Sequence, residues 1–341
     1  MNWLILPLAF VVAILLTGLL RRYALRQSLL DVPNDRSSHA RPTPRGGGMS
    51  ITLVVLVAVP LLAVYGNLPV MILLALLPAG VLIAITGWLD DHHHLAIPWR
   101  AASYVLAAVW FVWISGGLPE LSLGSGTWTT GILNLPLVVL ALAWLTNLYN
   151  FMDGADTLAG LQAVLAGTTG AILFWLQGTE SLAALAAVIA AAAAGFLVWN
   201  MPPARIFMGD VGSCFLGFIF GCLAVVGERV AQLPALLWIL LLGFFIWDAT
   251  CTLLMRILRR ENWYAAHRCH AYQRLIQLGW SHGRVALAFL LYNVLILWPL
   301  TLWAYYKPGY LPVSVIIGTV ITVITWGIVQ LLYYRHKEVA A

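Results

Sequence analysis

Charged residues are scarce in this sequence: Asp, Glu, Lys and Arg make up only 9% of its 341 residues. A soluble domain usually contains about 25% of these residues. Hydrophobic residues account for 62% of the chain, which is more apolar surface than a soluble fold can bury. The composition therefore excludes a soluble protein and predicts an all-α polytopic membrane protein that forms one domain over residues 1–341.

Cysteine is also rare, and its spacing indicates neither a disulfide framework nor a zinc module. The four cysteines are Cys214, Cys222, Cys251 and Cys269. A secretory signal is missing as well, because no basic residue precedes the first apolar run and no small-x-small cleavage site follows it. Arg21 and Arg22 follow that run instead, which predicts an uncleaved first span with its N-terminus outside.

Long apolar runs predict about eleven transmembrane helices, since about 20 apolar residues span a bilayer and backbone groups cannot stay unpaired in lipid. The expected spans are 3–20, 49–66, 69–88, 98–116, 132–148, 158–177, 180–200, 213–231, 234–255, 285–304 and 313–333. The odd number places the two termini on opposite sides of the membrane, and with the N-terminus in the periplasm the C-terminus lies in the cytoplasm. The expected cytoplasmic catalytic loops are about 21–48, 89–97, 149–157, 201–212 and 256–284.

The basic residues select this orientation. Sixteen of the eighteen Lys and Arg residues then lie on the cytoplasmic side, as the positive-inside rule requires, and only Arg229 and Lys307 lie outside. All eight histidines share that side with seven aspartates, namely Asp31, Asp35, Asp90, Asp91, Asp153, Asp156 and Asp210. We therefore expect a bacterial inner-membrane protein with a site open to the cytoplasm. The net charge of +5 then reflects these loops and anionic phosphate substrates, not nucleic acid.

The first cytoplasmic loop is basic and rich in glycine. It carries Arg36, Arg41 and Arg45 and ends in three consecutive glycines at residues 46–48. Arginine side chains and glycine backbone amides suit phosphate oxygens. An ordinary basic loop with a flexible hinge has the same composition, so both interpretations stay open.

Two adjacent acids, Asp90 and Asp91, close the third span. Neighbouring carboxylates repel each other, and the C-terminal end of a helix disfavours acids. The pair therefore predicts a cationic partner, such as Mg²⁺ bound to a diphosphate. The alternative is a solvated helix end capped by two acids.

Asn147, Asn150 and Asp153 recur at every third residue where the fifth span ends, and they share one face if the helix continues through them. Asp156 extends the spacing. Because Asn is costly inside a membrane, the array favours amide recognition combined with carboxylate ligation of a metal. A cap and a turn would explain one or two of these residues but not four.

Asp210 lies between Gly209 and Gly212, and Ser213 begins the eighth expected span. The glycines let the backbone approach a ligand, and amides at the start of a helix could hold phosphate. A Gly-Asp turn with a serine cap is the alternative.

The longest loop, 256–284, is cationic and carries histidines. A zinc site at His267, Cys269 and His270 is disfavoured, because the spacing is cramped and a fourth ligand is not evident. An interfacial amphipathic helix held by anionic lipid would explain the same residues. Asp248, inside the ninth expected span, is either a functional acid or part of a structural ion pair.

Together these motifs resemble the polyprenyl-phosphate N-acetylhexosamine-1-phosphate transferases, which form glycosyltransferase family 4. The resemblance rests on D-D at residues 90–91, N-x-x-N-x-x-D-G at 147–154, F-M-G-D-x-G-S at 207–213 and the histidine loop. The stretches 36–48 and 267–274 look closest to the branch that initiates O-antigen synthesis. A triple histidine is absent at 267–270, which argues against a muramoyl-pentapeptide substrate. Thr157, where a second glycine is usual, and Cys269, in place of a common serine, are departures.

The resemblance implies transfer of a sugar 1-phosphate from a UDP-sugar to polyprenyl (undecaprenyl) phosphate, with release of UMP, at the start of O-antigen or lipopolysaccharide synthesis. The sugar would be an N-acetylhexosamine or a 6-deoxy relative. Mg²⁺, with Mn²⁺ as a substitute, would be held by Asp210 and Asp153. The implied catalytic residues are Asp90, Asp91, Asp153 and Asp156, and the implied substrate-binding residues are Asn147, Asn150, Phe207, Arg45, His267, Arg268 and His270.

Three other classes fit less well. A transporter or flippase would have interrupted spans and ionisable residues near the bilayer midplane, yet Asp248 is the one acid well inside an expected span, since Glu180 and Glu228 lie at span ends. A CDP-alcohol phosphotransferase would carry a D-G-x-x-A-R run, which this sequence lacks. A purely structural membrane protein would leave four acidic loop clusters unexplained. Membrane lipid is an expected partner, and a homodimer is left open.

Overall fold

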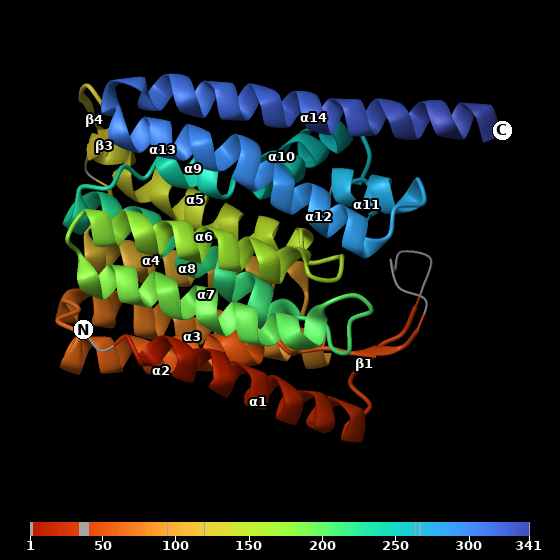
Figure 1. Cartoon of the computed structure of the whole chain (residues 1–341), viewed down its shortest axis with the longest axis horizontal. Coiled ribbons are helices and arrows are strands. Elements are labelled where there is room, and N and C mark those ends of the chain that lie inside the picture. The colour runs from red at the N-terminus through yellow and green to blue at the C-terminus, as the bar shows by residue number, and fades with distance from the viewer. Residues whose placement is uncertain are drawn as a thin grey trace.

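The computed structural model is a bundle of long helices that run along one axis (Figure 1). It describes residues 3–33, 41–93, 95–118, 120–262, 264–265 and 267–340. Some residues that the sequence places in cytoplasmic loops lie outside this described part, namely Asp35, Arg36, His39 and His94.

The first half of the bundle is built from seven helices and two short hairpins. The helices are α1 (Ile5–Arg26), α2 (Met49–Tyr65), α3 (Val70–His93), α4 (Ile97–Ser115), α5 (Asn134–Phe151), α6 (Leu158–Leu176) and α7 (Glu180–Asn200). Antiparallel strands β1 (Leu30–Asp31) and β2 (Thr43–Pro44) join α1 to α2. Strands β3 (Glu120–Ser122) and β4 (Thr127–Thr129), followed by the 3-10 turn η1 (Gly131–Leu133), join α4 to α5.

The second half begins with α8 (Asp210–Ala231). It continues through α9 (Leu237–Leu241), α10 (Gly243–Leu258), α11 (Ala271–Gln277), α12 (His282–Tyr292), α13 (Trp298–Tyr306) and α14 (Leu311–Ala340). A π-helical segment, η2 (Asn293–Leu297), joins α12 to α13, and the 3-10 turn η3 (Pro308–Tyr310) precedes α14.

The described residues contain nine helices long and apolar enough to cross a membrane, and α2, at 17 residues, is a shorter apolar helix. The chain is therefore an all-α multi-pass membrane protein with nine or ten candidate spans. The expected count of eleven is corrected at residues 234–255, which do not form one continuous helix.

The break in that expected span lies at Leu242, whose backbone (φ −107°, ψ 11°) separates the five-residue α9 from the sixteen-residue α10. A break inside a membrane leaves backbone groups that need new partners. Here the side-chain amide of Gln162, on α6, donates to the carbonyl of Leu241 at 2.8 Å. The sequence lacks a proline at this point, so hydropathy alone predicted an unbroken helix.

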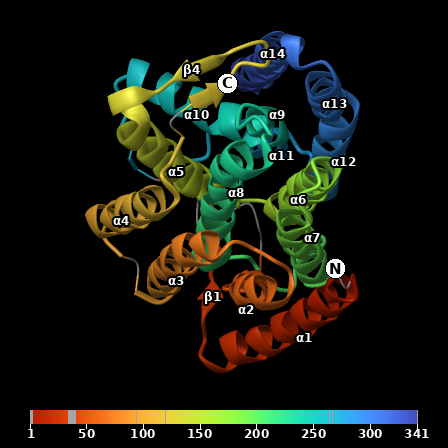
Figure 2. The same ribbon diagram turned by 90° about the vertical axis from the view of Figure 1, so that its left-hand side faces the viewer.

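Helix α8 forms the centre of the bundle, as the end-on view in Figure 2 shows. In its most apolar 18-residue window 94% of the residues are buried, against 17% for α1 at the periphery. The start of α8 carries Asp210, so the fold places that acid on its most enclosed element.

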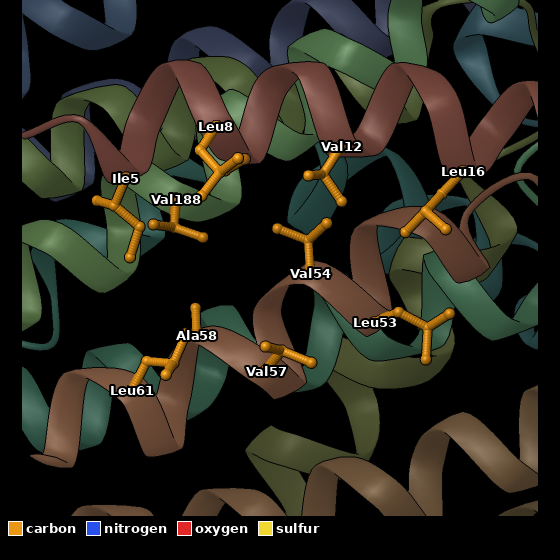
Figure 3. A pocket seen from close by; sticks show the side chains of 11 residues that line it. Ile5, Leu8, Val12, Leu16, Leu53, Val54, Val57, Ala58, Leu61 and Val188 are labelled. Carbon is orange, nitrogen blue, oxygen red and sulfur yellow. The ribbon is translucent and has the colours of Figure 1, made fainter.

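The outer helices present aliphatic side chains. A groove between α1, α2 and α7 is lined by Ile5, Leu8, Ala9, Val12, Leu16, Leu53, Val54, Val57, Ala58, Leu61 and Val188 (Figure 3). Leu8 and Val57 are 61% and 58% exposed there. Such exposure is costly in water but suits contact with lipid.

Candidate active site

The carboxylate of Asp91 caps the start of α8. Asp91 lies near the end of α3 and is 4% exposed. Its Oδ1 accepts a hydrogen bond from the Asp210 amide at 3.0 Å, and its Oδ2 accepts one from the Val211 amide at 3.2 Å. The positive end of the helix dipole stabilises a carboxylate at this point. The amides that we expected to hold phosphate therefore already donate to an internal carboxylate.

Gly209 makes this cap geometrically possible. It precedes α8 with φ at +76°, and a Cβ added to it would lie 2.7 Å from Asp91 Oδ2. Both constraints favour glycine. The helix begins at Asp210, three residues before the expected Ser213, and the Ser213 hydroxyl instead lies 3.2 Å from Asn150 Oδ1 and 3.0 Å from the Gly209 carbonyl oxygen.

Arg100 joins two acids of the site. Its Nη1 lies 2.6 Å from Asp90 Oδ2 and 3.7 Å from Asp210 Oδ2. Asp90 Oδ1 also accepts a hydrogen bond from the Leu95 amide at 2.7 Å. The cationic partner expected for the acid pair is therefore supplied partly by α4, and sequence analysis gave Arg100 no role. Asp210 remains the more accessible acid, with its side chain 27% exposed against 5% for Asp90.

Asp153 lies in the turn after α5, next to Asp91. Its amide donates to the Asn150 carbonyl at 3.1 Å, and α5 ends at Phe151. The helical face expected for the array therefore holds for Asn147 and Asn150 but not for Asp153. Burial raises the pKa of the Asp153 carboxyl well above its usual value, with the negative charges of Asp91 and Asp156 adding to the shift, although a hydrogen bond from the Gly209 amide opposes it.

Asp156 is held on two sides. Its Oδ2 accepts a hydrogen bond from the Ala204 amide at 3.1 Å, and its Oδ1 lies 3.2 Å from Nδ1 of His282, at the start of α12. His282 was counted among the loop histidines without a role of its own. Thr157 follows with φ at +74°, in the left-handed region that favours glycine. Its amide donates to Asn200 Oδ1 at 2.8 Å, which helps to hold this conformation.

The first loop is bound to the segment before α8 by backbone hydrogen bonds. The amides of Gly47 and Gly48 donate to the carbonyls of Phe207 and Met208 at 2.9 and 2.8 Å, and the Phe207 amide donates to Pro44 at 2.8 Å. These two glycine amides therefore do not serve the phosphate role that their composition indicated. They hold the backbone of Phe207, whose side chain is half-buried three residues before Asp210.

Arg45 reaches the acid pair from this loop. Its guanidinium donates to the backbone carbonyl of Asp91. The two residues also line a small cavity together with Gly46, Trp88 and other side chains of α1, α2 and α8.

The histidine loop lies at the end of α5. His270 is 3% exposed, and its ring centroid lies 6.1 Å from that of Phe151 and 4.9 Å from that of His267. Burial, reinforced by the nearby cations Arg256 and Arg274 and by His270, lowers the pKa of His267 to about 3. His267 is therefore neutral at physiological pH and does not add to the cationic surface that we expected. The Arg268 carbonyl accepts a hydrogen bond from Gln277 at 2.8 Å.

Within the described residues, no group of three or more His, Cys, Asp or Glu side chains is arranged to hold a metal ion. Mg²⁺ usually takes one or two carboxylates and completes its shell with water and substrate phosphates. Asp210 has a partly exposed carboxylate. The Asp153 carboxylate accepts a hydrogen bond from the amide of Gly209, the residue before Asp210. These two acids would supply the protein ligands.

Comparison with known proteins shows which sequences this chain resembles. Residues 73–228 match the family described as glycosyl transferase family 4. A probable undecaprenyl-phosphate N-acetylglucosaminyl 1-phosphate transferase of Bacillus subtilis (strain 168) is 29% identical over 285 residues, covering 80% of this chain and 78% of that protein. The decaprenyl-phosphate N-acetylglucosaminephosphotransferase of Mycolicibacterium smegmatis is 29% identical over 358 residues, covering 93% and 86%.

A third relative is named for a different substrate. The phospho-N-acetylmuramoyl-pentapeptide-transferase of Shouchella clausii is 27% identical over 317 residues, covering 85% of this chain and 94% of that protein. The segment that matches the family contains every acid described above from Asp90 to Asp210, and it ends before α11.

Proposed function

We propose that this chain, as a member of glycosyl transferase family 4, transfers a sugar 1-phosphate from a UDP-sugar to polyprenyl phosphate. The observation that carries this proposal is the convergence of Asp90, Asp91, Asp153 and Asp210, from α3, the turn after α5 and α8, around the start of the central helix. Convergent carboxylates suit a divalent cation that bridges a diphosphate, which is what phosphoryl transfer needs.

In the proposed reaction an oxygen of the lipid phosphate attacks the β-phosphorus of the UDP-sugar. The new bond joins that oxygen to the β-phosphorus, and the bond between the β-phosphorus and the bridging oxygen breaks. The products are polyprenyl-diphospho-sugar and UMP. Mg²⁺, or Mn²⁺ in its place, would neutralise the phosphate oxygens when bound.

The residues of this chain have separate parts in that reaction. Asp210 and Asp153 would hold the cation, and Asp91 fixes the start of α8 so that Asp210 is correctly placed. Arg100 orients Asp90, whose carboxylate would position the lipid phosphate. Phosphate is already a competent nucleophile, so we favour a single displacement without an aspartyl intermediate.

Asn147 and Asn150 would contact the nucleotide, and Phe207 would stack on uracil. Arg45, His267, Arg268 and His270 would contact the diphosphate or the sugar. The basic residues at the ends of the spans favour a cytoplasmic site in a bacterial inner membrane, where UDP-sugars are available.

For the sugar, we propose N-acetylglucosamine or a 6-deoxy relative, at the start of O-antigen or a similar cell-envelope glycan. The Bacillus and Mycolicibacterium relatives are named for N-acetylglucosamine, which supports this sugar. The stretch at 267–274, which resembles the O-antigen-initiating branch, supports it as well. The Shouchella relative, which acts on a muramoyl-pentapeptide, makes the sugar the first point to test.

The test offers the purified protein a panel of UDP-sugars with undecaprenyl phosphate, with and without Mg²⁺, and identifies the lipid product by its mass. We expect a Mg²⁺-dependent product whose mass equals the lipid phosphate plus one sugar phosphate, together with one UMP per product. Absence of UMP release with every UDP-sugar in the panel would contradict the proposal.

A further inference from the structure

Asp248 is an acid that the proposed reaction leaves without a role. It lies on α10, is 1% exposed and accepts three hydrogen bonds. Its Oδ1 accepts from the Ala271 amide at 2.8 Å and from the Thr252 hydroxyl at 3.2 Å, and its Oδ2 accepts from the Tyr272 amide at 3.4 Å. The two amides begin α11, so Asp248 caps that helix from a different element.

His270 immediately precedes the capped helix. Its Nδ1 lies 3.5 Å from Asp248 Oδ1. On one face its ring stacks on that of Tyr272, with centroids 5.8 Å apart and an interplanar angle of 15°. A carboxylate near one imidazole nitrogen favours the tautomer with the proton on that nitrogen and leaves the other nitrogen as an acceptor.

The same short helix is tied to the acid cluster. The Tyr272 hydroxyl donates to the Phe151 carbonyl at 2.9 Å, where α5 ends two residues before Asp153. Burial and the negative charges of Asp248 and Asp153 raise the Tyr272 pKa well above its usual value, so the phenol stays a donor. Gly154 permits this approach, since a Cβ there would lie 2.2 Å from the Tyr272 oxygen.

The other end of α11 is held independently. The guanidinium of Arg274 lies 3.7 Å from the ring centroid of Tyr333 on α14 and donates to Gln277 at 3.0 Å. The last turn of α11 therefore has a contact of its own with α14. The first turn is held by Asp248, by the Tyr272 hydroxyl and by the bond from the His270 amide to Gln273 at 3.3 Å, and Asp248 is the one acid among these groups.

We propose that Asp248 is a positioning residue that holds the start of α11 against the Asp153 turn and sets the orientation and tautomer of His270 for binding of the UDP-sugar. Asp248 does not touch substrate in this account. It acts through His270 and through the two amides that it accepts. The inference rests on the proposed function, because the sugar nucleotide is the ligand that His270 would meet.

The test compares Asp248→Asn and His270→Ala, separately and together, in the purified protein. Asn keeps the size of Asp and one of its acceptor oxygens but loses the charge that sets the imidazole tautomer. We expect Asp248→Asn to raise the KM for the UDP-sugar about tenfold and to leave the KM for polyprenyl phosphate unchanged. In the His270→Ala background the same change should add little, because coupled residues are not additive.

Thr250→Val is the matched control on the same helix. It removes the hydrogen bond that Trp144, on α5, donates to the Thr250 hydroxyl at 3.1 Å and keeps the Asp248 carboxylate. We expect that variant to keep both KM values. A purely structural role for Asp248 would reduce the active fraction, and hence kcat, without a selective change in KM.

Unchanged KM values in Asp248→Asn, or effects that add fully in the double variant, would overturn the inference. So would failure of Asp248→Asn to fold while His270→Ala folds, because the role would then be structural alone. The wild-type protein in the same assay separates this inference from the proposed function. A wild type that releases no UMP contradicts the proposed function, whatever the variants do.

Discussion

Asp91 and Asp248 perform the same structural task in opposite electrostatic surroundings. Each is a buried carboxylate from one helix that accepts two amides at the start of another, Asp91 at α8 and Asp248 at α11. Asp91 is surrounded by the further acids of its cluster, whereas Asp248 faces His270. If the proposed function holds, the same capping arrangement places the cation-binding Asp210 on one side of the site and His270, for the anionic substrate, on the other.

The largest effect should come from removing Asp210, the partly exposed acid beside the first cap. Asp210→Asn is expected to lower Mg²⁺-dependent UMP release about a thousandfold, because charge stabilisation in phosphoryl transfer is worth that order. Asp31→Asn, at an acid of strand β1, is the matched control and should keep its rate. Release of UMP is measured in membranes supplied with UDP-sugar and undecaprenyl phosphate, and normal turnover by Asp210→Asn would remove that acid from the site.

Replacing each capping aspartate with alanine compares the two electrostatic surroundings through the free energy of unfolding. Asp248→Ala should lower the free energy of unfolding by about 2 kcal/mol, since it leaves buried amides without an acceptor. Asp91→Ala should cost less, about 1 kcal/mol, because it also relieves repulsion among neighbouring carboxylates. Thermal unfolding in detergent gives the order, and a larger loss for Asp91→Ala would show that the acid cluster is not under like-charge repulsion.

Asp153 provides a second test of the repulsion among the clustered carboxylates. Its pKa is raised by burial and by neighbouring acids, so the folded state binds the proton more tightly than the unfolded chain does. Folding is therefore opposed by this group as pH rises above the ordinary Asp value of 3.8. Asp153→Asn should raise Tm at pH 7 without divalent cation, and the gain should shrink at pH 4 while activity is lost. An equal gain at both pH values would point to a cause other than charge.

The smallest effect is expected at Thr157, in the turn between α5 and α6. Thr157 is held with φ at +74°, which costs a residue with a Cβ about 1–2 kcal/mol. Thr157→Gly relieves this strain but loosens the unfolded chain, so we expect a net gain of less than about 1 kcal/mol. Thr157→Ala keeps the strain and serves as the comparison in the same unfolding measurement. A gain in the Ala variant equal to that in the Gly variant would exclude strain as the cause.

Sequence analysis located the helices and the acids well because both signals are local. Apolar runs mark the spans, and Asp90, Asp91, Asp153 and Asp210 stand out as acids at their ends. We expected these acids to border one site, and the structure brings the Asp91 carboxylate to the backbone amide of Asp210. The roles given to the individual site residues stay predictions.

The missed features depend on partners that are distant in sequence. Arg100 and His282 became meaningful only when folding placed them beside Asp90 and Asp156. The glycine and helix-start amides seemed suited to phosphate because a single sequence does not show that other chain segments already accept their hydrogen bonds. The break at Leu242 was not predicted for a similar reason. The carbonyl of Leu241 accepts a hydrogen bond from the side chain of Gln162, which is 79 residues away.

The central claim is that the β-phosphate of a UDP-sugar moves with its sugar to the lipid. The most direct measurement uses an accepted UDP-sugar carrying radioactive phosphorus at either the α or the β position, with undecaprenyl phosphate and Mg²⁺. The account predicts that β label appears in the lipid product and α label in free UMP. Release of both labels together as UDP, or passage of an intact UDP-sugar across the membrane, would contradict it.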